Sequence, residues 1–303
     1  MKTPALAAAP GPHPHESAHL HVSGEATYTD DIPELAGTLH CALGLSAKAH
    51  ARIQSMDLVA VTDAPGVLAV LTAADIPGEN NCGPIVRDDP ILAEDQVQYV
   101  GQPLFAVVAE SHDAARRAAR KAVVVYQELP AVLTPAEAKR QQSYVVPPMR
   151  LTRGNPTRAL ESAPHRLSGE FQVGGQEQFY LEGQIAYVAP SEDNSLQIWC
   201  STQHPTEMQQ VVCHALNLRS HQVLVEMRRM GGGFGGKESQ SALFCCVAAL
   251  AASVLNRPVK LRPDRDDDMM ITGKRHCFDY VYDVGFDADG LILGARVEML
   301  ARA

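Results

Sequence analysis

The stretch SHQVLVEMRRMGGGFGGKESQSALFCCVAALAASVL, residues 220–255, has three parts of different physical character. Its first ten residues read as a β-strand, and residues 239–255 are apolar nearly all round, which predicts a buried helix. Between them, five glycines surround Phe234 in MGGGFGGKESQ, residues 230–240. Glycine is used where the backbone takes positive φ or comes close to another group. A glycine loop between a strand and a helix also gathers backbone N–H groups that can hold an anion.

A nucleoside-triphosphate loop is one interpretation of this segment. Gly231, four further residues and then Gly236 and Lys237 match the pattern G-x-x-x-x-G-K. That motif needs a serine or threonine next, to hold magnesium, and Glu238 stands there instead. A carboxylate at this position would repel phosphates, so the interpretation is poor.

A dinucleotide-binding loop is a second interpretation, because Gly231, Gly233 and Gly236 match G-x-G-x-x-G. That pattern is weak alone and needs an acidic residue about 20 positions later to hold the ribose. After Glu238, however, the next carboxylate is Asp264. The remaining interpretations are a loop that faces a bulky cofactor, with Glu238 directed at whatever binds beside it, and a plain glycine turn between core elements.

The composition of the chain excludes several classes of protein. Its 303 residues predict two domains, and 46% hydrophobic with 20% charged residues is typical of a chain with a sizeable core. A net charge of −9 argues against nucleic-acid binding. The longest apolar run, residues 242–255, is too short to span a membrane, and the start shows no secretory signal. Seven cysteines without a CxxC pair predict reduced thiols in the cytoplasm, with neither a zinc nor an iron–sulfur site.

The chain divides into four regions on pattern alone. Residues 1–18 are rich in proline and histidine, which predicts a mobile tail. Residues 19–140 alternate strands and helices in an α+β unit, and four prolines mark 141–166 as a linker. Strands with intervening helices fill 167–303 and end on a strand, which suggests that the sequence is part of something longer.

An aspartate-rich segment near the end of the chain has the start of a calcium loop. Asp264, Asp266 and Asp268 form D-x-D-x-D. Met269 stands where that loop needs glycine, and Arg275 stands where it needs the bidentate glutamate. We therefore expect a structural, salt-bridged segment.

Three motifs of the second unit resemble the xanthine dehydrogenase and aldehyde oxidase family of molybdenum hydroxylases. RRMGGGFGGKESQ (228–240) resembles the cofactor loop of that family. GGQEQFYLEGQ (174–184) and RDDDMMITGKRH (265–276) resemble two further motifs of the same family. The length and order of these motifs make the resemblance very specific.

The first unit resembles the same family. VSGEATYTDDIP (22–33) and VGQPLFAVVAE (100–110) are similar to its α/β hammerhead domain. The resemblance thus extends over nearly the whole chain. It implies an α+β fold, with an α/β hammerhead domain at 19–140 followed by the first part of a mixed α+β molybdopterin-binding domain at 167–303.

The resemblance implies roles for four residues at a molybdenum–molybdopterin cofactor, whose metal is held by a pterin dithiolene and not by protein side chains. Gln176 matches a glutamine that hydrogen-bonds an oxo ligand of the metal. Gly233 and Phe234 match the stretch whose backbone approaches that group, and the missing side chain of glycine permits the approach. Glu238 matches the glutamate that faces the substrate in xanthine-oxidising members. Taken alone, these residues would be a strand-end glutamine, a core aromatic and a first-turn glutamate favoured by the helix dipole.

The wording of the motifs leans toward xanthine-oxidising members of a bacterial form, in which the molybdenum subunit is a separate chain. This implies hydroxylation of hypoxanthine and xanthine to urate with water as the oxygen source. Electrons would pass to 2Fe-2S and FAD centres on a partner chain, within a higher oligomer of heterodimers. The family's general-base glutamate and substrate-clamping arginine have no counterpart in residues 1–303, so the piece alone is expected to be inactive. An aldehyde or N-heterocycle oxidoreductase and a non-catalytic truncated scaffold stay open as alternatives.

Overall fold

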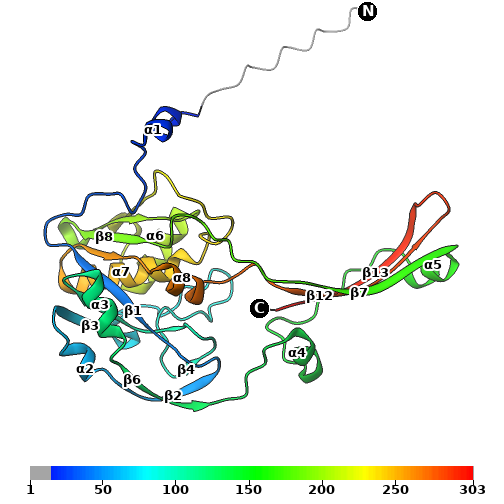
Figure 1. Ribbon diagram of the computed structural model, residues 1–303, viewed down its shortest axis with the longest axis horizontal. Coiled ribbons are helices and arrows are strands. Elements are labelled where there is room, and N and C mark those ends of the chain that lie inside the picture. The colour runs from blue at the N-terminus through cyan, green and yellow to red at the C-terminus, as the bar shows by residue number, and fades with distance from the viewer. Residues whose placement is uncertain (1–14, 303) are drawn as a thin grey trace, which may run out of the picture.

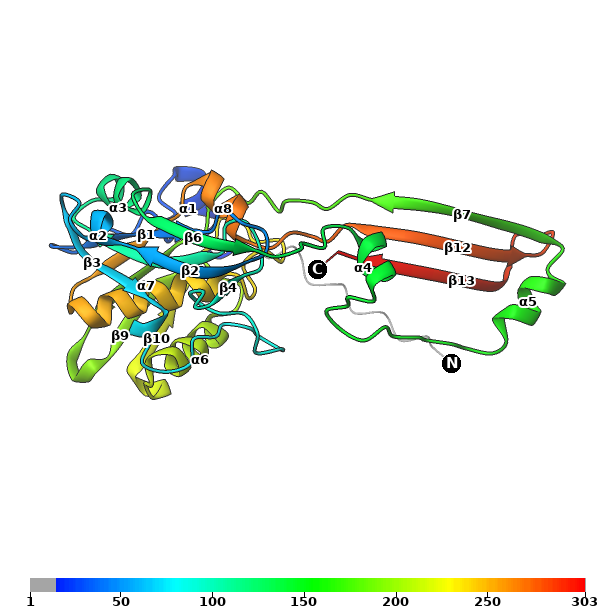
Figure 2. The ribbon, with the colours of Figure 1, turned by 90° about the horizontal axis from the view of Figure 1, so that it is seen from below.

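The computed structural model describes residues 15–302 of the chain. The predicted tail at 1–18 lies mainly outside the described residues, and the first helix, α1 (Ala18–Ser23), begins where that tail ends. A body holds most of the elements and an arm projects from it, as two views at right angles show (Figures 1 and 2). Helices and strands are mixed along the chain, which confirms the predicted α+β class.

The body is built on one mixed seven-stranded sheet in the order β10-β9-β8-β11-β1-β5-β3. β1 (Leu39–Leu45) comes from the first predicted unit and pairs in parallel with β11 (Val259–Leu261) from the second. The two units therefore share a sheet and do not have separate ones. The other strands are β3 (Val67–Thr72), β5 (Pro103–Ala109), β8 (Ala186–Pro190), β9 (Leu196–Cys200) and β10 (Val223–Glu226).

Helix α7 (Ser241–Leu255) packs against β8, β9 and β11 and against helix α6 (Pro205–Leu216). Every residue from 241 to 252 is buried, which confirms the predicted buried helix. Alanine is the commonest residue of this helix, and its small side chain lets the helix lie close to the strands. Burial raises the pKa of the Cys246 thiol, as is typical of an inert core cysteine.

A smaller sheet, in the order β4-β2-β6, packs on β5 through a second apolar cluster. Phe105 and Val107 of β5 are fully buried in that cluster. Helix α3 begins after Ser111, whose Oγ accepts a hydrogen bond from the Ala114 N–H at 3.2 Å. The elements of this part are β2 (Ala51–Asp57), β4 (Gln96–Val97), β6 (Val123–Glu128), α2 (Val59–Thr62) and α3 (His112–Ala119).

The arm is a three-stranded antiparallel sheet in the order β13-β12-β7. Its strands are β7 (His165–Val173), β12 (Phe278–Phe286) and β13 (Ile292–Ala301), so two segments far apart in the sequence lie side by side in it (Figure 2). Helices α4 (Pro135–Gln141) and α5 (Pro156–Ser162) accompany the sheet.

Helix α5 lies inside the range predicted to be a linker, 141–166. The four prolines of this range predict a segment without regular structure. Pro156, however, occupies the first turn of the helix, where its missing N–H costs nothing. Asn155 caps the helix by accepting the Arg158 N–H at 3.0 Å. The helix packs on β12 and β13 and so belongs to the arm.

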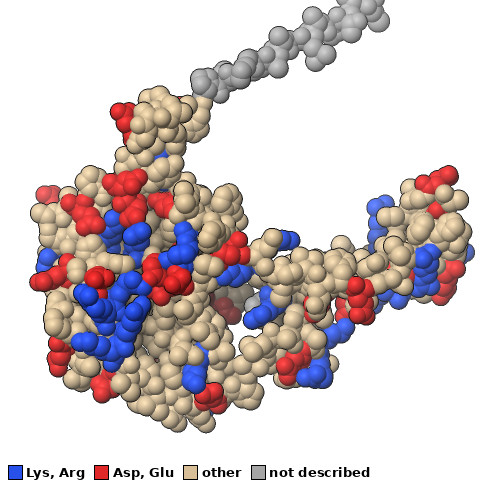
Figure 3. Space-filling view, in the orientation of Figure 1, with Lys and Arg blue, Asp and Glu red and all other residues tan. Residues whose placement is uncertain are grey.

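The remaining elements are short, and α8 (Arg265–Ile271) is the one that matters for the site. Within residues 15–302, no helix has both the length and the apolar character needed to cross a bilayer. Acidic and basic side chains are interspersed on the face of the body shown in Figure 3. The 3₁₀ turns are η1 (Ala73–Asp75), η2 (Glu192–Asn194) and η3 (Ser220–Gln222).

Candidate functional site

The glycine loop, residues 230–240, connects β10 to α7 and so confirms the predicted strand–loop–helix order. Its backbone is left-handed at three positions, with φ of +100° at Gly232, +52° at Phe234 and +88° at Gly235. Positive φ is uncommon for a bulky residue and is maintained only when the surrounding structure imposes it. The Phe234 ring is 76% exposed, so it is not the core aromatic that its residue type suggests.

Two glycines of the loop are needed because the loop lies directly on the segment 180–182. A Cβ atom on Gly231 would stand 2.4 Å from the Cβ of Glu182. A Cβ atom on Gly236 would stand 2.8 Å from a ring carbon of Tyr180. Side chains at these positions would therefore push the loop away from its support.

Neighbouring residues fill the space that a side chain on Gly233 would occupy. A Cβ atom there would stand 2.6 Å from Oε1 of Gln203 and 2.9 Å from the methyl carbon of Met230. The missing side chain therefore makes room for Gln203. The open position is Gly235, which has no atom within 4 Å of its Cβ position.

A buried ion pair lies beneath the loop. Lys237 has no exposed surface, and its ammonium donates to the backbone oxygen of Glu182 and to Oγ of Ser201, each at 2.7 Å. The ammonium is 3.6 Å from the Glu182 carboxylate and 4.6 Å from the centre of the Tyr180 ring. Burial lowers the pKa of Lys237, and the carboxylate of Glu182 opposes that shift.

The Glu182 carboxylate joins three separate segments. It accepts hydrogen bonds from the N–H of Gly231 at 2.9 Å and from Oγ of Ser201 at 2.6 Å. Its other oxygen accepts the N–H of Thr29, which precedes β1, at 3.0 Å. One side chain therefore fixes the start of the glycine loop, the end of β9 and the segment that leads into the first unit.

A second buried cluster fixes the end of the loop. Asp268 on α8 accepts hydrogen bonds from the Tyr180 hydroxyl at 2.7 Å and from the Gln184 N–H at 2.9 Å. The amide of Gln184 donates to the backbone oxygen of Gly236 at 2.9 Å. Burial, with Asp268 beside the hydroxyl, raises the pKa of Tyr180. Asp268 thus supports the loop indirectly, through Tyr180, on which Gly236 lies, and through Gln184.

The motifs at 174–184 and 265–276 lie against each other. Gln176 and Arg275 form an isolated antiparallel bridge with two backbone hydrogen bonds of 3.0 Å. The Arg275 guanidinium also donates to the Gln176 side-chain oxygen. Lys274 and Glu177 form an ion pair at 2.9 Å. The aspartate-rich segment is therefore structural and salt-bridged, as predicted.

The four predicted site residues are held by these supports but differ in exposure. Gln176, Phe234 and Glu238 are exposed, whereas Gly233 is buried. The N–H groups of Gly233 and Phe234 donate to no acceptor among residues 15–302. Beneath them, the side chain of Gln203 accepts the N–H of Gly235 at 2.9 Å and so fixes the inner side of the loop.

Two family models together match nearly the whole of this arrangement. The molybdopterin cofactor-binding domain matches residues 137–303, and the a/b hammerhead domain of aldehyde oxidase and xanthine dehydrogenase matches residues 23–130. The chain belongs to the aldehyde oxidase and xanthine dehydrogenase family.

Relatives in this molybdenum hydroxylase family are much longer than the chain. The xanthine dehydrogenase of Oryza sativa subsp. japonica is 45% identical over 289 residues, which are 94% of this chain and 21% of that protein. Aldehyde oxidoreductase from Desulfovibrio gigas superposes with a TM-score of 0.84 and 27% identity over 95% of this chain and 34% of its own. Quinoline 2-oxidoreductase from Pseudomonas putida 86 superposes with a TM-score of 0.80 and 26% identity over 94% of this chain and 38% of its own. The chain spans about a fifth of the length of the curated relatives it matches.

The loop residues fit the molybdopterin cofactor of this family. Within residues 15–302, no group of three or more histidine, cysteine, aspartate or glutamate side chains could hold a metal ion. A metal at the loop would therefore need ligands that come with it from a cofactor. The site offers neutral donors: the N–H groups of Gly233 and Phe234, and the amide NH₂ of Gln176, whose oxygen is taken by Arg275. Such donors suit the electronegative ligands of a metal held by an organic cofactor.

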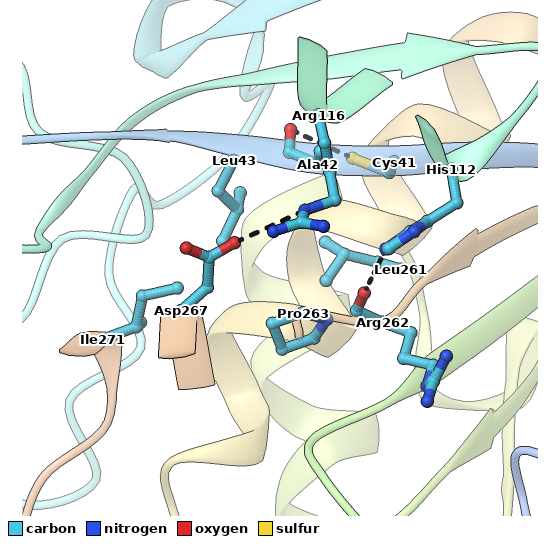
Figure 4. Close-up of a pocket in the computed structure, with 10 residues that line it drawn as sticks. All are labelled: Cys41, Ala42, Leu43, His112, Arg116, Leu261, Arg262, Pro263, Asp267 and Ile271. Carbon is cyan, nitrogen blue, oxygen red and sulfur yellow. Dashed lines mark hydrogen bonds and ion pairs between the residues drawn. The ribbon is translucent and has the colours of Figure 1, made fainter. Parts of the chain in front are cut away.

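The hammerhead part of the family fold supports α8 at a small polar joint. Arg116 on α3 pairs with Asp264, the N-cap of α8. The Nε of Arg116 is also 3.9 Å from the Asp267 carboxylate (Figure 4). The His112 ring contacts the backbone oxygen of Arg262 at 2.9 Å. The hammerhead domain thereby positions the helix that carries Asp268.

The supporting residues were not assigned roles from the sequence alone. Glu182, Gln184 and Asp268 all lie within the quoted motifs. Lys237 enters the sequence analysis only as the lysine of the nucleoside-triphosphate pattern G-x-x-x-x-G-K. A usable signal was present in YLEGQIAYVAP, where a glutamate and a glutamine interrupt a run that becomes a buried strand. Buried polar side chains need hydrogen-bond partners, so the sequence could have predicted that each of these two residues is bound to another part of the chain.

Proposed function

We propose that the chain forms the hammerhead domain and the first part of the cofactor domain of a purine-hydroxylating molybdenum subunit of the xanthine dehydrogenase type. The complete enzyme converts hypoxanthine and xanthine to urate, with oxygen from water. Electrons leave through iron–sulfur and flavin centres on a partner chain, within a higher oligomer of heterodimers in the cytoplasm. One observation carries the proposal: the loop is anchored from beneath by Lys237, and the next residue, Glu238, is exposed.

Three residues would hold the cofactor. The N–H groups of Gly233 and Phe234 and the amide of Gln176 donate hydrogen bonds toward it, which places neutral donors beside electronegative ligand atoms. When bound, the cofactor supplies the redox chemistry and the oxygen-transfer step. The Glu182–Lys237 pair keeps the loop in the conformation that presents these donors.

Glu238 would bind the purine. A carboxylate accepts hydrogen bonds from ring N–H groups, and a protonated carboxyl can donate to ring acceptors. Hydrogen bonds that strengthen as negative charge develops on the ring lower the barrier for hydroxylation. The neighbouring lysine is fully buried and turned to the other side of the loop, so it does not neutralise this carboxylate through a direct contact.

The test is turnover by the complete subunit produced with its redox partner chain. We expect urate from xanthine, carrying ¹⁸O when the reaction runs in labelled water. A subunit loaded with molybdenum that forms no urate and oxidises no aldehyde would instead favour the non-catalytic scaffold.

Residues 1–303 alone are expected to bind no stoichiometric molybdenum and to form no urate. The family's general-base glutamate and substrate-binding arginine have no counterpart among them, so the loop alone offers donors without the remaining active site. Elemental analysis and a urate assay on the purified chain measure this directly. Urate formation above the rate of a buffer blank would contradict it.

A second candidate is an aldehyde or N-heterocycle oxidoreductase. It is favoured by the superposition on an aldehyde oxidoreductase and on quinoline 2-oxidoreductase. The same loaded subunit distinguishes the two, because turnover of aldehydes or quinoline without turnover of hypoxanthine would assign the second function.

A further inference from the structure

The sheet of the arm has two faces of opposite character. Side chains alternate between the faces of a strand, and the register places the even-numbered residues of β12 opposite the odd-numbered residues of β7. In the pairing of β12 with β13, Tyr280 lies opposite Met299 of β13, and Tyr282 lies opposite Val297 of β13. We call the face that carries Tyr280, Tyr282 and their partners the aromatic face.

The face opposite the aromatic face is covered by the chain itself. Gly285 and Gly294 pair there, and a Cβ atom on either one would stand within 3 Å of an alanine of the α5 segment, at 2.6 Å and 2.8 Å respectively. Arg296 donates to Thr157 of α5 at 3.0 Å, and Glu298 pairs with Lys139 of α4. Helices α4 and α5 therefore lie on this second face.

The aromatic face is apolar and open. Phe171 stacks on Tyr280 with ring centres 4.6 Å apart, yet it is 49% exposed. Leu167, Val297 and Met299 are 56%, 53% and 60% exposed. No aspartate, glutamate, lysine or arginine occupies the register positions of this face, and His165 is its one imidazole among the described residues.

The aromatic face is as large as the largest apolar patch of a typical monomer. Three strands about 4.8 Å apart and about 30 Å long present roughly 400 Å² on one side. Such a largest patch covers about 300–600 Å² and is often functional. The lack of charge excludes a nucleic acid or an acidic peptide as the occupant, because both need cationic partners.

We propose that the aromatic face binds an apolar layer supplied by the part of the molybdenum subunit that follows the matched region in the relatives. The superposition on aldehyde oxidoreductase covers 95% of this chain but only 34% of that enzyme's chain, so most of that polypeptide lies outside the matched region. The curated relatives have still more chain outside it. The inference rests on the proposed function only in taking the chain as part of a longer subunit.

The test is cysteine labelling at one position of the aromatic face. Val297→Cys is made in a Cys277→Ser background, because Cys277 is half-exposed whereas the other six cysteines are buried. Maleimide labelling at position 297 is expected to be at least about tenfold slower in the complete subunit than in residues 1–303 alone, because docking removes solvent access. Val59→Cys, at a 66% exposed position on α2, is the control and should label equally in both.

Equal labelling of position 297 in both proteins would overturn the proposal. Protection in residues 1–303 alone that grows with protein concentration would also overturn it, since the occupant would then be a second copy. Hydrogen exchange of residues 292–301 in the two unmodified proteins gives an answer without any substitution. Slower exchange in the complete subunit is expected, and unchanged exchange would contradict the proposal. None of these measurements depends on turnover, so they fail independently of the proposed reaction.

Discussion

Glu238→Ala is expected to lower kcat/KM for xanthine in the complete enzyme by about 10²–10³-fold, the usual effect of removing one transition-state hydrogen-bonding group. The loss should fall mainly on kcat, because the bond strengthens as charge builds on the purine ring. Glu238→Gln keeps the shape and one acceptor and should lose less activity. Steady-state urate formation measures both variants.

The control for Glu238 is Glu226→Gln. Glu226 is an exposed carboxylate at the end of β10, and it accepts a hydrogen bond from the Gln197 amide at 3.4 Å. That change should leave kcat/KM within about twofold, as surface substitutions usually do. Turnover of a small aldehyde should survive Glu238→Ala, which separates lost purine binding from lost structure. Wild-type xanthine turnover by Glu238→Ala would refute the substrate assignment.

Lys237→Met is expected to lower the free energy of unfolding by about 3–5 kcal/mol, because it leaves the Glu182 carboxylate buried without its cation. Lys237 has no exposed side-chain surface, and Glu182 keeps only 10% of its own. Adding Glu182→Gln should restore part of the loss, since an amide needs no counter-ion. Urea unfolding of the chain can be followed by Trp199, its one tryptophan, which stacks on Tyr187 at 5.2 Å.

The matched control is the ion pair between Lys48 and Glu128, whose side chains are 38% and 68% exposed. Lys48→Met should cost no more than about 1 kcal/mol, because water screens and replaces such a pair. If both lysine variants lose the same stability, the pair beneath the loop has no special role. In that case, adding Glu182→Gln to Lys237→Met should also recover none of the lost unfolding free energy.

Much of the local structure could be predicted because it depends on short-range pattern. The uninterrupted apolar run at 241–255 has no polar face to expose, so it forms a buried helix. The alternating strands and the loop between β10 and α7 follow from the same kind of pattern. Helix α5 was hidden because its one proline, Pro156, also fits a linker, although proline suits the first turn of a helix.

The tertiary arrangement could not be predicted from local pattern. Nothing in the sequences around Leu39 and Val259 says that they lie side by side and join two domains into one sheet. The contact between Gly233 and Gln203 was hidden for the same reason, because the two residues are 30 positions apart. The family resemblance supplied the candidate site residues, but the buried residues that hold them became visible only in three dimensions.

We have proposed that the anchored glycine loop presents its free N–H groups to molybdopterin and Glu238 to a purine. A crystal structure of the complete subunit with cofactor and hypoxanthine is the decisive experiment. We expect a Glu238 carboxylate oxygen at hydrogen-bonding distance from a purine nitrogen or oxygen, about 2.6–3.2 Å. We also expect the N–H groups of Gly233 and Phe234 on the cofactor side of the loop. A cofactor bound elsewhere, with Glu238 facing solvent, would refute the proposal.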